Sequence, residues 1–356
     1  MAYTDIDDAS AHFQIATYTG NANLNTIVND GNSDLAPDLV WGKCRSTSKT
    51  HYWYDTTRGT EKRIESDNGG AEDTGTNGLY IFQSDGFKLA SGNTENDNGE
   101  SYVAWQWKAN GGSRTTFSES GNNPGGGYQA NTTGGISIVD YVGTQAAGTV
   151  AHGLGAVPKM IIVKSRGASR SWTVYHHQMG SPANEKNMVL NTTAALTDYN
   201  ADYWGATTPT SSVFSLGGTN GHAVNYNNEN FIAYCFAEVQ GFSKFGSYIG
   251  NGSANGPMIY TGFQPAWVMI KTTSTADDWY IFDNKREGYN PSVWRIRANT
   301  ISGDTTGTNN TVDHLSNGFK LRFTGGSING SKLPYIYMAF AENPFVTSTG
   351  VSTTAR

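Results

Sequence analysis

The chain has 356 residues, of which 37% are hydrophobic, 12% are aromatic and only 15% are charged. The aromatic residues exclude a disordered chain, because disordered chains lack the large apolar groups that offset chain entropy. The 43 glycines, together with many Asn, Thr and Ser residues, exclude a protein built from long helices. The net charge of −6, without any basic run, argues against nucleic acid as a partner.

The first ten residues, MAYTDIDDAS, are acidic and polar. A secretory signal needs basic residues followed by an apolar run of about 7–15 residues. No stretch of the chain approaches the ~18 consecutive apolar residues that cross a bilayer. We therefore expect synthesis in a cytoplasm, no export by that route and no insertion in a membrane.

One pattern of residues occurs three times along the chain. In each copy a proline opens an apolar segment, a lysine follows six positions later, and a tryptophan or histidine follows the lysine by eight. These anchors are Pro37, Lys43 and His51, then Pro158, Lys164 and Trp172, then Pro265, Lys271 and Trp279. Three positions further on, each copy has an aromatic residue that we expect in a core, namely Tyr54, Tyr175 and Phe282. Matching spacing in three copies predicts a tandem repeat of one structural unit.

The repeat divides the chain into three units with separate cores. We expect the first unit, with an N-terminal arm, over residues 1–110, the second over 136–240 and the third over 241–343. Residues 111–135 are rich in Gly and Asn and are expected to form a flexible or surface-draped linker. Only the segment VQGFS connects the second and third copies, so these two should be held closely. Residues 344–356 are expected to form a flexible tail.

Hydrophobic residues within each copy alternate with a period of two, which is typical of strands. In the second copy, Ile232, Tyr234 and Phe236 alternate with the smaller Ala233 and Cys235. We expect the bulky face to point toward a core and the small face toward a second layer or a neighbour. Since no segment shows a helical stripe, the fold class should be all-β, with three tandem β-sandwich units of jelly-roll type. A small closed barrel is the alternative.

No catalytic or metal-binding motif stands out. The HExxH, GxSxG, phosphate-loop and CxxC patterns are absent from the sequence. The acidic loop 95–100 could hold calcium through oxygen ligands, but it lacks the alternation of an EF-hand. His176 and His177 are neighbours on a predicted strand and point to opposite faces, so they cannot easily share an ion. We expect no catalytic residue, cofactor or metal, and therefore no enzyme; Cys44 and Cys235 should be buried thiols.

Two kinds of recurring charged residue need an interpretation. The repeated lysine should end a buried strand, lay its stem over an aromatic ring and extend its ammonium into water. Asp55 and Asp283 each have an arginine three positions later, and the second copy has His176 at that place. We interpret the two aspartates as members of ion pairs or turn caps at the strand end, with a ligand-binding carboxylate as the alternative.

Aromatic residues in loops are candidates for binding sugars. A Trp or Tyr ring can stack on a sugar ring, and a neighbouring Asn can bind the sugar hydroxyls. The candidate glycan-contact residues are Tyr203, Trp204, Tyr226, Asn227 and Tyr289. The alternative is that these residues are turn residues that cover a hydrophobic edge.

Several long segments carry a resemblance to a known family. These are IDDASAHFQIATYTGN, NDGNSDLAPDLVWGK, SDGFKLASG, YVAWQWKAN and ENFIAYCFAEVQGFSKFGSYIGNGSANGPMIYTGFQPAWVMIK. They resemble a repeat family of tail-fibre and other virion structural proteins of marine bacteriophages, especially cyanophages, and the resemblance runs from about Ile6 to Phe345. It implies concanavalin- or lectin-like sandwiches and a virion protein without enzyme activity. It brings no catalytic or binding residues.

We therefore expect a non-enzymatic bacteriophage virion protein. The first hypothesis is a tail-fibre or spike-type surface projection that binds a glycan of the host surface, assembled with other virion proteins as a homotrimer. The alternative is a capsid decoration, cement or head-fibre protein with a purely structural role, monomeric or templated by the capsid. A polysaccharide-cleaving enzyme would need two carboxylates facing one cleft about 5–10 Å apart, and no such pair stands out in the sequence.

Overall fold

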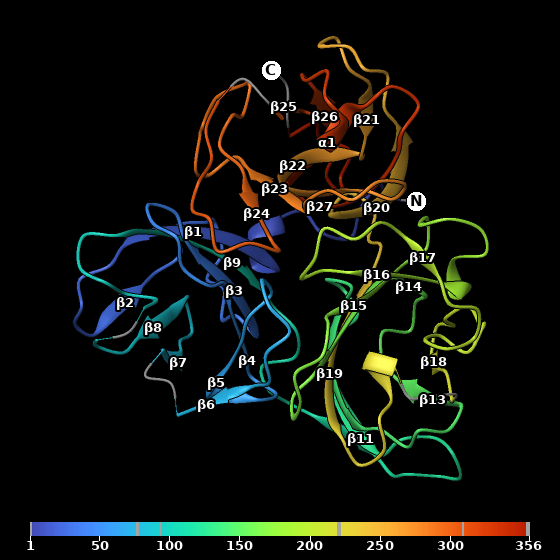
Figure 1. Ribbon diagram of the computed structural model, residues 1–356. Helices are drawn as coiled ribbons and strands as arrows, with labels where there is room; N and C mark the ends of the chain where they lie inside the picture. The colour runs from blue at the N-terminus through green and yellow to red at the C-terminus, as the bar shows by residue number, and fades with distance from the viewer. Residues whose placement is uncertain (1, 76–77, 93, 219–221, 308–309, 354–356) are drawn as a thin grey trace.

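The computed structural model describes residues 2–75, 78–92, 94–218, 222–307 and 310–353. Strands make up 42% of the structure and helices 3%, which confirms the all-β fold class. The described strands form six antiparallel sheets, arranged as three pairs of one larger and one smaller sheet (Figure 1).

The first pair of sheets encloses its own small apolar interior. The larger sheet has the order β1 (Phe13–Thr19), β9 (Ser101–Trp107), β3 (Leu39–Cys44), β4 (Tyr52–Asp55), β5 (Gly59–Ile64), β6 (Asp73–Thr74). The smaller sheet has the order β2 (Asn25–Ile27), β8 (Phe87–Leu89), β7 (Leu79–Phe82). Val40 and Tyr54 of the larger sheet pack with Leu79 and Phe87 of the smaller one. The pair is a β-sandwich, which we call the first unit; the short helix η1 (Ala9–Ala11) precedes it.

The second unit has the longest sheet. Its order is β10 (Thr115–Phe117), β11 (Gly126–Asn131), β12 (Ile136–Val142), β19 (Asn230–Ala237), β14 (Pro158–Ser165), β15 (Thr173–His176), β16 (Lys186–Val189), β17 (Thr197–Asp198). The partner sheet pairs β13 (Gly148–Ala151) with β18 (Val213–Leu216), and two short helices, η2 (Ala183–Glu185) and η3 (His222–Val224), lie in the loops. Residues 111–135, expected as a linker, instead supply β10 and β11, since β11 pairs along β12 from Gly126 to Asn131.

The third unit repeats the arrangement. Its larger sheet has the order β20 (Ser243–Ile249), β27 (Pro334–Pro344), β22 (Phe263–Thr272), β23 (Tyr280–Asp283), β24 (Ile296–Arg297). The smaller sheet has the order β21 (Met258–Tyr260), β26 (Gly318–Leu321), β25 (Val312–Leu315), and the single-turn helix α1 (Gly326–Asn329) precedes β27. In all three units the closing aromatic strand lies between the opening strand and the strand that carries the repeated lysine.

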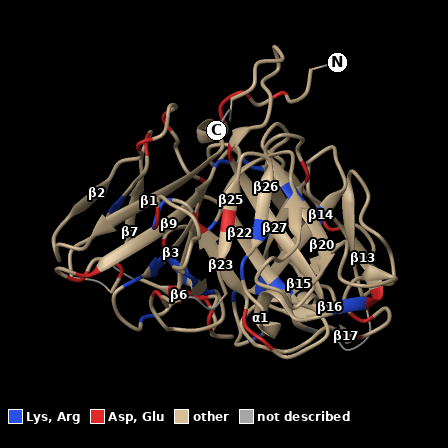
Figure 2. Ribbon diagram, turned by 90° about the horizontal axis from the view of Figure 1, so that it is seen from above, with Lys and Arg blue, Asp and Glu red and all other residues tan. Residues whose placement is uncertain are grey.

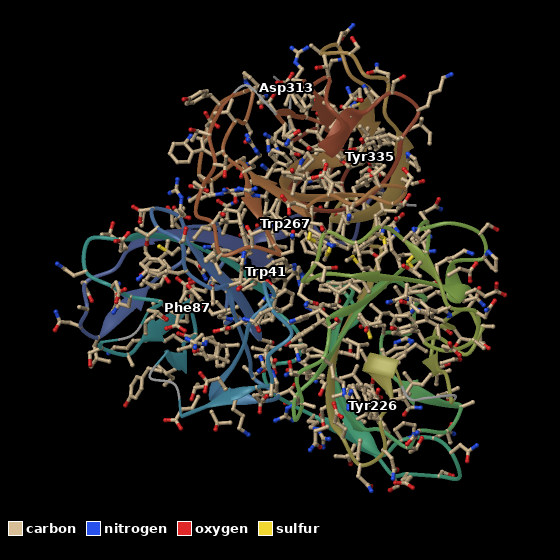
Figure 3. The ribbon with its side chains drawn as sticks, in the orientation of Figure 1. Trp41, Phe87, Tyr226, Trp267, Asp313 and Tyr335 are labelled. Carbon is tan, nitrogen blue, oxygen red and sulfur yellow. The ribbon has the colours of Figure 1, made fainter. Side chains whose placement is uncertain are left out.

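The three units surround one aromatic centre. Equivalent residues of the closing strands, Trp107, Phe236 and Phe340, contact one another with ring centroids 5.5 to 6.4 Å apart. Figure 3 shows Trp41 and Trp267 close to the same centre, where the three units meet. The apolar core runs continuously through all three units. The expectation of three separate cores therefore holds only for the small interior of the first sandwich. The interiors of the second and third units are continuous with the shared centre, because each sheet turns its bulky face toward its neighbours.

The closing strand turns its bulky face toward a core and its small face toward a second layer, as expected, and the core on the bulky side is the one that the three units share. In β9, Trp105 and Trp107 belong to the shared core, whereas Ala104 faces the interior of the first sandwich. Three sheets converge at the centre, and the space between them is filled by large rings. Small residues on the other face let the smaller sheet of the sandwich approach closely.

The two ends of the chain lie toward the same side of the molecule (Figure 2). The N-terminal arm crosses the other units: Tyr3 Oη donates to the Gly262 carbonyl, and Thr4 Oγ1 donates to the Gln240 carbonyl, both at 2.7 Å. Asp7 accepts hydrogen bonds from the backbone N–H and the hydroxyl of Ser348. Within the described residues, no helix has the length and apolar character to cross a membrane.

Candidate functional site

The repeated lysine binds the neighbouring unit and does not reach water. The Nζ atoms donate to backbone carbonyls across the unit boundaries, from Lys43 to Ile301 at 2.8 Å, from Lys164 to Gly69 at 3.3 Å and from Lys271 to Thr193 at 3.1 Å. All three lysines are 0% exposed, so the expectation that their ammonium groups reach water is wrong. Burial lowers the pKa of each ammonium to about 8. The first unit thus holds the third, the second holds the first and the third holds the second, which closes a ring.

We call each boundary between two units a seam. A second hydrogen bond recurs at each seam. The side chain eight positions after the lysine bonds a carbonyl of the same neighbouring unit: Trp172 Nε1 to Glu65 at 2.8 Å, Trp279 Nε1 to Val189 at 3.0 Å and His51 Nε2 to Arg297 at 3.0 Å. These bonds are directed to backbone atoms, so they depend little on the identity of the neighbouring side chains. The recurring Lys and Trp or His anchors of the sequence are therefore seam residues.

Two seams also contain buried ion pairs. The carboxylates of Asp55 and Asp283 bind Arg58 and Arg286 at 2.5 and 2.6 Å, with all four side chains 0% exposed. This agrees with the interpretation as ion pairs at the strand end. Each carboxylate also accepts a hydrogen bond across a seam, Asp55 from Tyr234 Oη at 2.8 Å and Asp283 from Trp105 Nε1 at 3.0 Å. With these partners in place, neither aspartate is available as a ligand-binding carboxylate.

The acidic loop 95–100 has a structural role. The amide of Asn96 is 0% exposed, accepts from the Asn21 N–H and donates to the carbonyls of Asn23 and Ala90. Asn225 and Asn329 hold the corresponding loops of the other units in the same way. This repeated Asn was missed in the sequence, although it stands six positions before an aromatic residue of each closing strand. Among the described residues, no group of three or more His, Cys, Asp or Glu side chains could hold a metal ion.

The five candidate glycan-contact residues do not form one site. Tyr203 and Trp204 follow β17, Tyr226 and Asn227 precede β19, and Tyr289 lies in the third unit between β23 and β24. Tyr289 is the most exposed of the five at 71%, and Asn227 is also exposed. The candidates therefore stand in three separate places on the molecule.

Two of the candidate rings are already covered. Trp204 is 1% exposed and donates its indole N–H to the Lys186 carbonyl at 3.1 Å, so its prediction as a glycan-contact residue is wrong. The loop folds back over the sheet, which places this indole against Tyr175 instead of in solvent. One face of the Tyr226 ring, labelled in Figure 3, is covered by the guanidinium of Arg170 at 3.2 Å from the ring centroid.

A large hollow lies in the second unit and was not predicted. It has a volume of about 650 Å³ and lies where the start of β14 meets the end of β15. We call it the second-unit cavity. Its lining consists of Val157, Pro158, Lys159, Tyr175, His177, Gln178, Gly180, Ser181, Pro182, Ala183, Asn184 and Thr208. Thr208 belongs to the same long loop as Trp204, so this loop forms part of the wall.

A smaller hollow of about 370 Å³ lies at the seam between the third and first units. It contains three carboxylates, of Asp8, Asp30 and Glu342. Asp30 binds Lys285 across the seam at 2.5 Å. Burial alone would raise the pKa of Asp8, but hydrogen bonds from Ser10 and Ser33 lower it below its ordinary value. The hollow is therefore built around bonded carboxylates.

Comparison with known proteins places the chain in a family without naming an activity. No curated protein matches the chain, and no solved structure matches it. A family model matches residues 8–344, which include all three units. The chain belongs to the family described as a domain of unknown function, DUF7483.

Proposed function

We propose that the protein is a non-enzymatic structural protein of a bacteriophage virion, of the tail-fibre or spike type, that binds a glycan of the host surface. The second-unit cavity is the observation that carries the glycan part of the proposal. Its lining combines hydroxyl, amide and ammonium groups with the apolar Val157, Pro158 and Pro182. Binding sites for small molecules combine apolar walls with a few convergent polar groups in this way. The virion part rests on the sequence resemblance.

A non-enzymatic role is supported by the state of the carboxylates. Glycoside hydrolysis needs an acid with a raised pKa beside a second carboxylate. The second-unit cavity has no Asp or Glu among its lining residues. In the smaller hollow the pKa of Asp8 is lowered and Asp30 is paired with Lys285. A binding protein fits these groups better than a hydrolase.

The ring favours a second candidate, a capsid decoration or head-fibre protein. Three sandwiches related by equivalent seams give the single chain an approximate three-fold arrangement (Figure 1). A body of that shape can sit on a three-fold position of a capsid without forming a homotrimer. In a fibre or spike, by contrast, we expect three copies of the chain.

Locating the protein on purified particles tests the proposal. Antibody labelling in the electron microscope should mark the tail, and the purified protein should bind host cells in a manner that soluble host polysaccharide abolishes. Labelling of the capsid together with absence of cell binding would favour the decoration role. A protein that is absent from the particle would overturn both. Release of oligosaccharide from host polysaccharide would overturn the non-enzymatic role.

A further inference from the structure

We propose that the second-unit cavity binds a carboxylated sugar residue, such as a uronate, with Lys159 facing the carboxylate and the Tyr175 hydroxyl bonded to a sugar hydroxyl. The inference rests on the proposed glycan-binding function and names its site and ligand class. It starts from a comparison of one position in the three units.

Tyr175 occupies a position that recurs in the ring but has a different environment in each unit. Tyr54, Tyr175 and Phe282 pair with Val40, Ile161 and Val268 at matching places of the three sheets. The Tyr54 hydroxyl donates to Glu95 at 3.2 Å, and Phe282 has no hydroxyl. The Tyr175 side chain is 2% exposed, lines the cavity, and its hydroxyl has no hydrogen-bond partner within the described part of the chain. A nearly buried, unpaired hydroxyl costs free energy unless a ligand or water bonds it.

The Tyr175 ring is held rigidly, so its hydroxyl has a fixed direction. Trp204 packs edge-on against it, with ring centroids 5.7 Å apart. Burial raises the pKa of Tyr175 to about 12, so the phenol keeps its proton at neutral pH and can donate it in a hydrogen bond. The loop that carries Trp204 and Thr208 differs in length from its counterparts in the other copies. This insertion gives the second unit a cavity wall.

The remaining polar groups suit a polyol. Ser181, Asn184 and Thr208 line the cavity and form no side-chain hydrogen bond within the described residues. Hydroxyl and amide groups can both donate and accept, as sugar hydroxyls do. His177 donates its Nε2 proton to the Phe245 carbonyl at 2.9 Å, and burial lowers its pKa, so the imidazole is neutral at pH 7. Its Nδ1 atom is then an acceptor.

The charge of the lining selects an anionic ligand. Lys159 is half-exposed. Because His177 is neutral, Lys159 is the one charged side chain among the cavity residues that the structure describes. Its ammonium forms no ion pair there, and no Asp or Glu lines the cavity to neutralise it. Phosphate sites usually gather arginine forks or several backbone N–H groups at a helix start. A single ammonium beside hydroxyls and amides is suited to one carboxylate on a sugar ring.

Titration calorimetry with monosaccharides tests the inference. The full chain should bind methyl glucuronide or methyl galacturonide about tenfold more tightly than the matching methyl glucoside or galactoside. Lys159→Met should remove this preference and leave the affinity for the neutral sugars unchanged. Tyr175→Phe should weaken binding of both kinds about fivefold. Lys88→Met, at a half-exposed position of β8 in the first unit, and Tyr54→Phe, at the equivalent tyrosine, are the matched controls and should bind as the wild type does.

The outcomes separate this inference from the proposed function. Equal affinity for charged and neutral sugars, unchanged uronate binding by Lys159→Met, or tighter binding of glycerol phosphate would overturn the carboxylated ligand. If Tyr175→Phe and Lys159→Met proteins bind host cells as strongly as wild type while the wild type ignores uronates, the cavity is not the glycan site and the proposed function stands. If the wild type binds neither monosaccharides nor cells, glycan binding itself fails.

Discussion

The seam between the second and third units differs from the other two in its side chains but not in its geometry. Where the other seams have buried Asp–Arg pairs, this one has His176 and Met179, and His176 Nε2 bonds the Tyr337 carbonyl at 3.2 Å. At every seam the lysine, and the Trp or His eight positions after it, bond backbone carbonyls of the neighbouring unit. The ring is therefore positioned by these shared bonds and by the aromatic centre, while the ion pairs are an interchangeable addition.

The same contrast extends to the outer part of the seams. Glu72 binds Arg166, and Asp304 binds Arg45, across the two charged seams. The two residue pairs are also joined by a backbone hydrogen bond. At the second–third seam the equivalent backbone bond joins Leu196 to Thr273, which carry no charge. A buried ion pair gives little net stability but is costly to break. The charged seams should thus be more sensitive to substitution without being stronger.

Removing one partner of a buried pair should have the largest effect. Asp55→Ala leaves the buried guanidinium of Arg58 with only the more distant carboxylate of Glu72, at 3.3 Å, and should lower the free energy of unfolding by about 3–5 kcal/mol. His176→Ala, the matched change at the second–third seam, removes a neutral hydrogen bond and should cost about 1–2 kcal/mol. Urea unfolding followed by tryptophan fluorescence measures both. Equal losses would contradict the distinction between the seams.

Moving the ion pair into the uncharged seam should be possible in two steps. His176→Asp alone buries an unpaired carboxylate and should destabilise the protein by about 3 kcal/mol. Adding Met179→Arg supplies the partner at the spacing used by Asp55 and Arg58, so the double variant should recover at least about 1 kcal/mol. A double-mutant cycle from urea unfolding gives the coupling. Additive losses would show that the seam backbone differs from that of the charged seams.

The lysines should give all seams the same pH dependence. Lys271 has a pKa of about 8 when folded, against 10.5 for an ordinary lysine. Between these pH values the unfolded chain binds more protons, so the wild type gains stability as the pH rises. Relative to Lys271→Met, this gain should reach roughly 1 kcal/mol between pH 7 and pH 9.

Lys164→Met, at a charged seam, should give the same pH-dependent difference, because its pKa is also lowered to about 8. Measuring both variants by urea unfolding at each pH cancels the contribution of the tyrosines and Cys235. If the stability difference between wild type and variant does not change with pH at either position, burial does not lower the pKa of these lysines.

Exposed ion pairs at the seams should matter least. Lys285 and Asp30 connect the third and first units, but their side chains are 36% and 67% exposed. Lys285→Ala should lower the free energy of unfolding by less than about 1 kcal/mol, and 1 M NaCl should remove the difference. A larger or salt-independent loss would mean that this pair contributes to closing the ring.

The sequence predicts the local structure well because its signals are local. Residue alternation and matched spacing identify the strands and the buried Tyr54, Tyr175 and Phe282. Alternation shows that a strand has a bulky and a small face, but it does not show which face meets a neighbouring unit. For this reason the sequence places Trp105 in a core but does not show that this core is shared with the neighbouring units. The Gly-rich segment 111–135 resembles a linker in composition, yet pairing with β12 makes it part of a sheet.

The residues of the candidate site were the hardest to predict. The buried ammonium of Lys43 donates to a carbonyl 258 positions away in the chain, and no local sequence pattern predicts such a contact. Trp204 was selected because it stands in a polar loop, but the loop folds onto Tyr175. The cavity depends on the relative position of two strand ends and two loops. One signal was available: the Tyr–Tyr–Phe series at the repeated position shows that the first and second units have a hydroxyl there and the third does not.

Ring closure also sets an order on folding during synthesis. The contact from Trp105 to Asp283 joins residues 178 positions apart, and that from Lys43 to Ile301 joins residues 258 apart. A ribosome that has completed the first two units has made one seam, and the tryptophan-rich face of the first unit is still uncovered. Contacts of such long range form slowly, and apolar faces that stay exposed until these contacts form favour aggregation. The last hundred residues therefore act as the closing segment that removes this exposed surface from the nascent chain.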